Sequence, residues 1–419
     1  MDARRAPLPR FATGREAALS LRPDHPVYCF RPAVLAADAA AFLRAFPGKT
    51  AYAAKANPEP MVLKALAAAG VAAFDVASPA ECAQVRAAVP GAELLYMHPV
   101  KAAADLRLAL ERDRVRVTVV DHEGELEKLP PLLKTLGIAP GEMTVLVRIA
   151  TPGKAARELS RKFGASPTRA ARLLRRVDGF GLKAGLCFHV GSQVADAGAY
   201  ERAVVRVAEV RAAAGVPLHG LDVGGGFPVP YGEDRRRKTA PPPSLDVILL
   251  RLAAALTRHG LDDVPLVAEP GRVIVARAFS VIARVLLRKG RRLYLNDGVW
   301  ASLSDAWTSR IILPVRHIAG SPGRQRRQGA ERRAEPVPFR IFGATCDSRD
   351  VLPQPFHLPE DVATGDWIEI GHIGAYSLSL RTRFNGFYPD TFVEVEEPFE
   401  AGDAPQGFGA PGHRAGPEE

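Results

Sequence analysis

Short apolar runs alternate with helix-like segments along residues 49–270. In the segments between the runs, alanine and leucine recur at the spacing of one helix face, as in PMVLKALAAAG and VKAAADLRLAL. Strands that alternate with helices are typical of a parallel sheet, and eight such runs favour a closed (β/α)8 barrel over an open doubly wound sheet. The eight runs are TAYAAKAN, VAAFDVAS, AELLYMH, RVRVTVV, MTVLVRIA, GFGLKAGLCFHV, LHGLDVGGG and VPLVAEPG.

Beyond residue 272 the chain consists of strand-like runs separated by turns, such as AFSVIARVLL, RRLYLND and FRIFGATC. These runs predict a second, all-β domain, and the segment before the barrel is expected to contribute a strand to it. The expected divisions are an N-terminal segment (1–30), the barrel (31–272), the β-domain (273–399) with an exposed insertion (319–338), and a disordered tail (400–419).

The net charge of +10 raises the question of nucleic acid binding. Much of the excess arginine lies in two runs, 235–238 and 323–333, within glycine- and proline-rich surroundings that are typical of loops. No aromatic residues interleave with these runs, as stacking on bases would require. We therefore expect solvated loops and no nucleic acid partner.

The cysteine pattern and the distribution of apolar residues indicate a cytoplasmic protein. The four cysteines show no CxxC spacing, which favours free thiols in a reducing compartment. The start of the chain lacks the apolar region of a signal peptide, and Arg277 and Arg284 interrupt the apolar stretch from Val273 to Leu287. We therefore expect no membrane span. Organelle targeting by the arginine-rich start stays open as an alternative, although Asp2 and Glu16 count against it.

Ionisable residues and glycines lie at the ends of the predicted barrel strands. Reactive side chains of (β/α)8 barrels lie at the carboxyl ends of the strands, so an active site is expected there. In chain order these residues are Lys55, Asp75, Arg148, His189, Gly224, Gly225, Gly226 and Glu269.

Lys55 and the glycine triplet 224–226 together predict a cofactor. A lysine at a strand end is usually solvated, but a desolvated lysine loses proton affinity and can form a Schiff base. The triplet alone is compatible with a tight turn, although its N–H groups would also suit a phosphate. With an acidic residue on the same face, these features predict pyridoxal phosphate, with His189 against its ring and Ser192 near its phosphate.

Nine motifs occur in the order found in one family of enzymes. They are YAAKAN, FDVASPAE, LSRKFGA, FHVGSQ, DVGGGFP, EPGR, NDGVW, CDSRD and GAYSLSLRTRFNGF. Over about residues 25–395 the chain resembles the fold-type III pyridoxal 5'-phosphate decarboxylases of basic amino acids, which comprise ornithine, lysine and diaminopimelate decarboxylases, and it is most similar to the ornithine enzymes. The resemblance implies an alanine racemase-like barrel with a C-terminal β-domain and no metal.

The resemblance also assigns roles at the cofactor. Lys55 is expected to bind it covalently and His189 to stack on its ring, above Asp75 and Arg148. Glu269 is expected to keep the pyridine nitrogen protonated, which favours decarboxylation; a related racemase would be expected to have arginine there. The expected ligands around the phosphate are Ser192, Gly224, Gly225, Gly226, Gly271, Arg272 and Tyr376.

In this family the active site is shared between two subunits. The resemblance implies that Cys346 of one subunit protonates Cα in the other, beside a substrate site formed by Asp347, Phe384 and Tyr376. An obligate head-to-tail homodimer is therefore expected, with an ion pair between Lys162 and Asp350 across the interface.

Asp347 favours L-ornithine as substrate, with putrescine and polyamine synthesis as the outcome. Diaminopimelate decarboxylases usually carry glutamate after the cysteine, and they would need an arginine for the second carboxylate, for which Arg349 is the nearest candidate. The simplest alignment places Ser309 where eukaryotic ornithine decarboxylases have a second substrate-binding aspartate, and Asp305, one helical turn earlier, could substitute for it. Since one methylene is worth only about 1–3 kcal/mol, lysine or dual specificity stays open.

Two other functions remain as alternatives. A non-catalytic antizyme-inhibitor-like regulator would be expected to have lost catalytic residues, whereas Lys55, His189, Glu269, Cys346 and Tyr376 are all present. An amino-acid racemase is disfavoured by Glu269.

Overall fold

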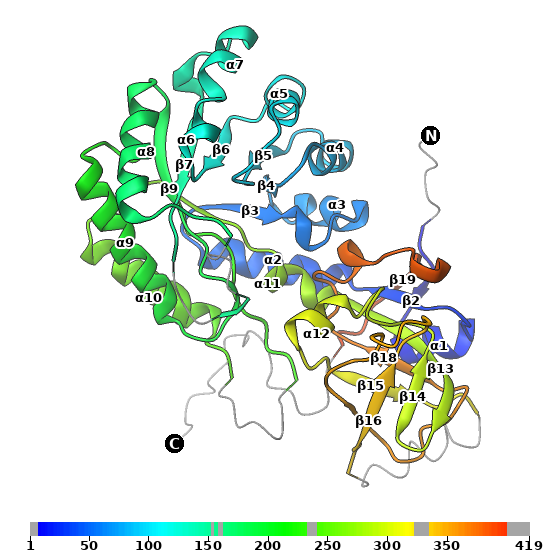
Figure 1. Ribbon diagram of the computed structural model, residues 1–419. Coiled ribbons are helices and arrows are strands. Elements are labelled where there is room, and N and C mark those ends of the chain that lie inside the picture. Colours follow the sequence, from blue (N-terminus) through cyan, green and yellow to red (C-terminus); the bar gives the residue numbers. More distant parts are fainter. Residues whose placement is uncertain (1–6, 152–154, 158–161, 233–240, 322–334, 400–419) are drawn as a thin grey trace, which may run out of the picture.

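The structure is a computed structural model that describes residues 7–151, 155–157, 162–232, 241–321 and 335–399. The arginine-rich runs at 235–238 and 323–333 and the tail from residue 400 lie outside these ranges. A barrel and a separate β-domain lie side by side (Figure 1). No helix in the described part of the chain combines the length and apolarity needed to cross a bilayer.

The barrel is closed, and its strands are the eight that the sequence pattern predicts. Their order around the barrel is β11-β12-β3-β4-β5-β6-β7-β9, and all neighbouring pairs are parallel. The predicted fold class is therefore confirmed. The strands are β3 (Lys49–Ala53), β4 (Ala73–Val76), β5 (Glu93–Tyr96), β6 (Val117–Val120), β7 (Thr144–Arg148), β9 (Lys183–Cys187), β11 (Leu221–Asp222) and β12 (Leu266–Ala268).

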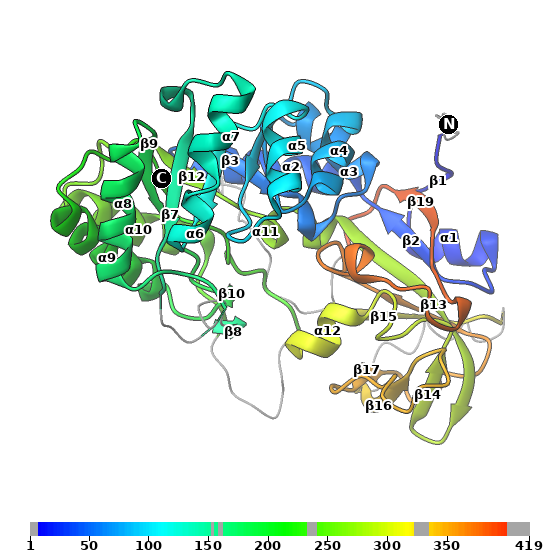
Figure 2. The same cartoon turned by 45° about the horizontal axis from the view of Figure 1, so that its top comes forward.

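Helices cover the outside of the barrel (Figures 1 and 2). Several begin at a serine cap, as where Ser78 accepts a hydrogen bond from the amide of Glu81. The segment HEGELEKLPPLLKTLG forms two helices, because its two prolines fit only the first turn of the second one. The helices are α2 (Pro32–Ala45), α3 (Pro60–Ala68), α4 (Pro79–Ala88), α5 (Ala103–Glu111), α6 (Glu123–Leu126), α7 (Leu129–Leu136), α8 (Pro167–Gly179), α9 (Gly198–Ala214), α10 (Leu245–Arg258) and α11 (Arg272–Val275).

Alternate strand residues fill the interior of the barrel. Ala51, Ala73 and Leu95 form one buried cluster, apart from the larger core that packs against the helices. A second cluster, formed by Val119, Leu146 and Cys187, continues around the barrel. The interior is therefore a packed core, and chemistry is confined to the strand ends.

The β-domain is a mixed sheet with strands from both ends of the chain. Strand β2, from the N-terminal segment, lies between β13 and β19. The strands are β1 (Arg10–Phe11), β2 (Val27–Phe30), β13 (Phe279–Lys289), β14 (Arg292–Leu295), β15 (Val315–Ile318), β16 (Val337–Phe342), β17 (Phe356–Leu358), β18 (Trp367–Ile370) and β19 (Thr391–Val395). Helices α1 (Gly14–Leu21) and α12 (Ser304–Ser309) accompany the sheet, and β8 (Ala155–Arg157) pairs with β10 (Ser192–Val194) beside the barrel.

The β-domain contacts the carboxyl ends of the barrel strands, and two of these contacts involve expected cofactor ligands. The amide of Tyr376 donates to the carbonyl oxygen of Ala56 at 2.8 Å. Asp305 of α12 forms a buried ion pair with Arg272 of α11 at 2.6 Å, and Figure 2 shows α12 on the side of the β-domain that faces the barrel. The domain contact therefore lies at the end of the barrel where reactive residues are expected.

Candidate active site

Lys55 lies at the mouth of the barrel, in the short 3-10 turn η1 (Ala54–Ala56) that follows β3. Strands β3 and β4 are paired with Ala53 opposite Asp75, and this register brings the Lys55 amine into a close ion pair with the Asp75 carboxylate. Asp75 is buried, whereas the Lys55 side chain is partly exposed. On the other side, a Cβ on Gly271 would lie 2.9 Å from that of Ala56, so only glycine lets α11 begin this close to η1.

The charges around Lys55 oppose the effect of burial. Burial alone would lower the pKa of Lys55, but the carboxyl groups of Asp75 and Glu269 raise this pKa above its usual value. The expectation that desolvation weakens the proton affinity of this lysine is therefore wrong, because an anion on the neighbouring strand outweighs it. At neutral pH Lys55 is an ammonium ion paired with Asp75.

His189 follows β9 and carries a neutral ring. Its Nδ1 accepts a hydrogen bond from the amide of Gly191 at 3.0 Å. Burial, with the positive charges of Arg148 and Lys55, lowers the pKa of His189 to about 3. Its Nε2 lies 3.5 Å from the position that a Cβ on Gly225 would occupy. The imidazole is therefore uncharged at physiological pH and adjoins the glycine loop.

Close backbone packing alone requires glycine at 224–226. Gly224 and Gly226 have φ of +69° and +101°. A Cβ on Gly226 would lie 2.1 Å from the carbonyl oxygen of Gly191, and a Cβ on Gly225 would lie 2.5 Å from that of Glu269. The triplet by itself is therefore no evidence for a phosphate site.

The position of Ser192 supports the phosphate prediction more directly. Ser192 begins β10, and the amide of Val194 in the same strand donates to the carbonyl oxygen of Gly226 at 3.1 Å. The carbonyl oxygen of Gly225 accepts from the Tyr200 hydroxyl at 2.9 Å. A serine hydroxyl therefore lies on a strand that is tied to the glycine loop, which is the arrangement needed if both bind one anion.

A buried group of carboxyl side chains lies at the ends of β4, β11 and β12. Asp75 and Glu269 were predicted from the sequence, and the structure adds Asp222, which accepts a hydrogen bond from the amide of Gly224 at 2.7 Å. One oxygen of each residue is buried and has no hydrogen-bond donor among the described residues: Asp75 Oδ1, Asp222 Oδ2 and Glu269 Oε1. Asp222 lies in the motif DVGGGFP at the end of the buried strand β11. An acidic residue at the end of a buried strand is the sequence signal that would have identified it.

Arg272 is the first residue of α11 and lies between the two domains. Its Nη1 donates to Asp305 at 2.6 Å and to the Tyr231 hydroxyl at 3.0 Å. The guanidinium lies 5.0 Å from the ring centre of Tyr376, and its buried Nε has no acceptor within the described residues. Arg272 therefore retains a donor for an anion, and Asp305 fixes its orientation.

Cys346 lies in an exposed turn of the β-domain. Its backbone amide and its thiol both point to Asn385 Oδ1, at 3.2 and 3.3 Å. Asn385, in the motif RFNGF, has φ of +52° and was not singled out from the sequence. Phe384, next to it, is 44% exposed and meets Trp300 edge to face. Cys346 and Phe384 therefore belong to one exposed surface.

Asp347 and Arg349 pair with each other in the same turn. The guanidinium of Arg349 donates to the Asp347 carboxylate at 3.0 Å and lies 5.5 Å from the ring centre of Trp300. Hydrogen bonds from Arg349 lower the pKa of Asp347, so its carboxylate stays ionised. Among the described residues, no hydrogen bond, ion pair or ring contact joins Cys346, Asp347 or Phe384 to the barrel residues.

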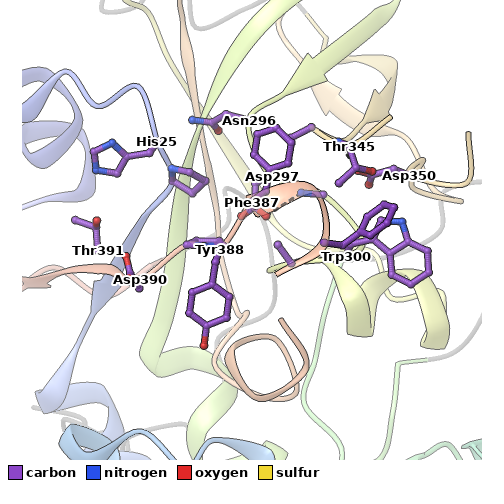
Figure 3. A pocket seen from close by; sticks show the side chains of 17 residues that line it. His25, Asn296, Asp297, Trp300, Thr345, Asp350, Phe387, Tyr388, Asp390 and Thr391 are labelled. Carbon is purple, nitrogen blue, oxygen red and sulfur yellow. Dashed lines mark hydrogen bonds between the residues drawn. The ribbon is translucent and has the colours of Figure 1, made fainter. Parts of the chain in front are cut away.

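Asp350 anchors this turn to the loop after β14. Its carboxylate accepts hydrogen bonds from the amide of Val299 at 2.8 Å and from the hydroxyl of Thr345 at 2.6 Å. A cavity of about 330 Å³ opens beside it, lined by residues of this turn, of the loop after β14 and of the segments 25–26 and 384–391 (Figure 3). Asp350 therefore positions the Cys346 turn within its own chain, and its expected pairing with Lys162 of another subunit stays a prediction.

Pyridoxal phosphate fits the residues at the barrel mouth. The Lys55 amine is accessible and lies in the same group as the buried, unpaired oxygen of Glu269. Arg272 Nε and the Ser192 hydroxyl are possible donors for a phosphate, and His189 offers a neutral ring beside the glycine loop. The amine, the carboxyl oxygen and the phosphate donors thus match the aldehyde, the pyridine nitrogen and the phosphate of this cofactor.

Comparisons with known proteins agree with this arrangement. Residues 33–276 match the family described as pyridoxal-dependent decarboxylase, pyridoxal binding domain. The chain is 34% identical to the lysine/ornithine decarboxylase of Selenomonas ruminantium, over 83% of this chain and 84% of that protein. It is 30% identical to antizyme inhibitor 2 of Xenopus laevis, over 83% and 75% of the two chains. The solved structure of lysine/ornithine decarboxylase from Vibrio vulnificus complexed with putrescine is similar at a TM-score of 0.74 and 29% identity, covering 92% of this chain and 99% of that one.

Proposed function

Because this chain belongs to the pyridoxal-dependent decarboxylases, we propose that it converts L-ornithine to putrescine and CO2 in a homodimer with shared active sites. Pyridoxal phosphate is its cofactor, and basic amino acids are its substrates. The observation that carries the proposal is the Lys55 ammonium beside Asp75 and Glu269 at the carboxyl ends of the barrel strands. The free state of all four cysteines supports a reducing, cytoplasmic location.

The barrel residues bind the cofactor and control protons around it. When bound, pyridoxal phosphate accepts the electron pair that remains at Cα after CO2 leaves. Lys55 supplies the amine that binds the cofactor, and Asp75 orients that amine. Glu269 holds a proton at the ring nitrogen, and His189 excludes water from the ring as an uncharged partner. Arg272 and Ser192 bind the phosphate.

The Cys346 turn completes the site of a second subunit. After CO2 departs, the Cys346 thiol donates its proton to Cα, and Asn385 Oδ1 orients that thiol. In one chain this turn is exposed, and among the described residues no contact ties it to Lys55 or Glu269. A head-to-tail dimer would place it over the partner's barrel, which is why we propose shared sites.

Asp347 is the proposed acceptor for the distal ammonium of the substrate. Its carboxylate is ionised and partly exposed, and Arg349 is already held by Asp347 and the Trp300 ring. A diaminopimelate enzyme would need Arg349 free to bind a second carboxylate. The ion pair therefore favours a cationic substrate end over an anionic one.

Lysine is the proposed second substrate. Ser309 donates to Asp305 Oδ1 at 3.0 Å, while the other oxygen of Asp305 pairs with Arg272. We therefore propose that Asp305 orients Arg272 toward the phosphate and does not replace the second aspartate, whose position Ser309 occupies. With Asp347 as the one proposed carboxylate for the distal ammonium, the site discriminates weakly by chain length.

The experiment that tests this function is a product analysis by mass spectrometry. The protein loaded with pyridoxal phosphate is incubated separately with L-ornithine, L-lysine, L-arginine and meso-diaminopimelate, with Lys55→Ala as the blank. We expect putrescine as the main product and some cadaverine. Lysine formed from diaminopimelate would overturn the substrate assignment.

The same experiment separates the enzyme from an antizyme-inhibitor-like regulator. A regulator of that kind would yield no amine from any of the four substrates. An active enzyme yields amine that disappears in Lys55→Ala, and it loses the visible absorbance of the cofactor in the same variant. Inversion of an amino acid without CO2 release would instead indicate a racemase.

A further inference from the structure

Asp222 lies beside Glu269 at the carboxyl ends of two neighbouring barrel strands. Strands β11 and β12 are paired with Asp222 opposite Val267, two residues before Glu269. The amide of Glu269 donates to the carbonyl oxygen of Gly224 at 2.9 Å, and the amide of Gly224 donates to Asp222 Oδ1 at 2.7 Å. This chain of two hydrogen bonds fixes both acidic residues to one glycine.

Each of the two side chains has a buried oxygen that lacks a donor. Asp222 is 1% exposed, and its side chain lies within hydrogen-bonding reach of Glu269. Apart from this contact, neither Asp222 Oδ2 nor Glu269 Oε1 has a hydrogen-bond donor among the described residues. An ionised carboxyl group only accepts hydrogen bonds, so two buried carboxylates side by side would both be unsatisfied and would repel each other. One proton between them makes one group a donor to the other and removes both penalties.

The charges that surround the pair also require one proton. The groups that interact with Asp222 and Glu269 are the carboxylate of Asp75 on β4, the ammonium of Lys55 after β3 and the guanidinium of Arg148 on β7. Three ionised carboxylates against two cations would leave one uncompensated negative charge in a buried site, and a single proton removes it.

We propose that Asp222 and Glu269 share one proton and that Asp222 is the positioning residue that keeps this proton at Glu269 for the ring nitrogen of the cofactor. The hydrogen bond from Gly224 holds Asp222 Oδ1, so its Oδ2 is left for Glu269. Asp222 thereby controls how readily Glu269 gives and takes a proton.

The expected titration of the pair agrees with this arrangement. Burial raises the pKa of Asp222 to about 7, and burial together with the charges of Asp222 and Asp75 raises the pKa of Glu269 well above its usual value. Burial and the Asp222 charge likewise raise the pKa of the Cys187 thiol on β9, so that thiol adds no charge at neutral pH. Both pKa values are raised, as expected if the two carboxyl groups titrate as a unit and share a proton at neutral pH.

Infrared spectroscopy of the cofactor-free protein tests the shared proton without any activity measurement. A protonated carboxyl group has a carbonyl stretching band that shifts in D2O, and it is compared at neutral pH in wild type, Asp222→Asn and Glu269→Gln. We expect the band of the pair in wild type and its loss in both variants. Its absence from wild type, or its persistence unchanged in Asp222→Asn, would overturn the proposal.

Asp297→Asn is a matched control. Asp297 is also a buried aspartate with an unpaired Oδ2, and burial raises its pKa to about 6, but it lies in the β-domain. This variant should keep the band of the Asp222–Glu269 pair. Circular dichroism of all three variants checks that the fold is intact, and Glu269→Gln provides the second test if Asp222→Asn does not fold.

A second measurement rests on the proposed pairing of Glu269 with the cofactor. In Asp222→Asn the amide donates permanently to Glu269, which makes Glu269 a weaker base toward the ring nitrogen. The pH at which the visible absorbance of the bound cofactor changes should therefore fall by about one unit, the equivalent of one hydrogen bond. An unchanged pH profile would remove Asp222 from this role. The infrared result stands apart from the proposed substrate, so either can fail alone.

Discussion

The barrel mouth and the Cys346 turn differ in the burial and in the electrostatic surroundings of their ionisable groups. At the mouth, ionisable groups from several strands are buried together, and their charges control one another, as in the ion pair of Lys55 with Asp75. In the turn, Cys346 is exposed and is oriented by one neighbour, Asn385. The first region is electrostatically organised by one chain, whereas the second presents its reactive group to the outside.

The proposed roles of the two regions account for this difference. A cofactor that remains bound requires charges that are fixed in advance, and burying them is tolerable because they compensate one another. The proposed action of Cys346 on a substrate in another subunit would require its thiol to stay accessible until the subunits meet. Asp350 meets this need, since it fixes the Cys346 turn from behind through Val299 and Thr345. Under the proposed function, cofactor chemistry and substrate chemistry are thus divided between two surfaces.

The largest effect is expected from removing the amine at the barrel mouth. Lys55→Ala should lower kcat/KM by on the order of 10³-fold or more, because the covalent and proton-transfer roles are lost together. Steady-state kinetics with L-ornithine measures the loss. Lys49→Ala removes an exposed lysine at the start of β3, the strand before Lys55; Lys49 pairs with Glu93, and its loss should leave kcat/KM unchanged. Equal losses in both variants would show that charge on β3, and not position, matters.

The second prediction concerns hybrid dimers, in which one subunit supplies an intact barrel mouth and the other an intact Cys346 turn. Lys55→Ala and Cys346→Ala should each be nearly inactive, but a mixture should recover about one quarter of wild-type activity, because half of the dimers are hybrids with one complete site of two. The variants are mixed in equal amounts, allowed to exchange subunits, and assayed for amine.

An equal mixture that stays inactive, although mass spectrometry detects hybrid dimers, would contradict the shared site. In that case Cys346 would act within its own chain, and the contrast between the two regions would have another cause. Cys82→Ala removes a buried thiol of α4 and serves as the control for the general effect of losing a cysteine.

The positions of the barrel strands could be predicted from the sequence better than the protonation states of the residues at their ends. All eight barrel strands follow from the alternation of apolar runs and helical segments, since each strand is buried and each helix has one apolar face. The behaviour of Lys55 was not predictable in the same way, because its pKa depends on a register that places Asp75 opposite Ala53. Asp222 and Asn385 were overlooked within quoted motifs, since their importance comes from atoms that face them across the fold.

The third prediction tests the buried electrostatics of the mouth through stability. The pKa of His189 falls from 6.5 to about 3 on folding, so the unfolded chain binds the proton more tightly and stability is lost as the pH falls below 6.5. Between pH 7 and pH 5 this costs wild type about 2 kcal/mol. The variant His189→Gln lacks this loss. The difference in free energy of unfolding, variant minus wild type, should therefore rise by about 2 kcal/mol between pH 7 and pH 5. Urea denaturation at both pH values measures it, and a difference between the proteins that does not vary with pH would contradict it.

The smallest effect is expected on α12, where the β-domain contacts the barrel through Asp305 and Arg272. Ser309→Asp would add a second carboxylate for the distal ammonium and should favour L-ornithine over L-lysine by about tenfold in kcat/KM, since one methylene is worth only that order of energy. Ser309→Ala removes the hydrogen bond to Asp305 without adding charge and should keep the wild-type ratio. If both variants change the ratio alike, the hydrogen bond that orients Asp305, and through it Arg272, sets chain-length selectivity, and the division between cofactor and substrate surfaces would fail at this helix.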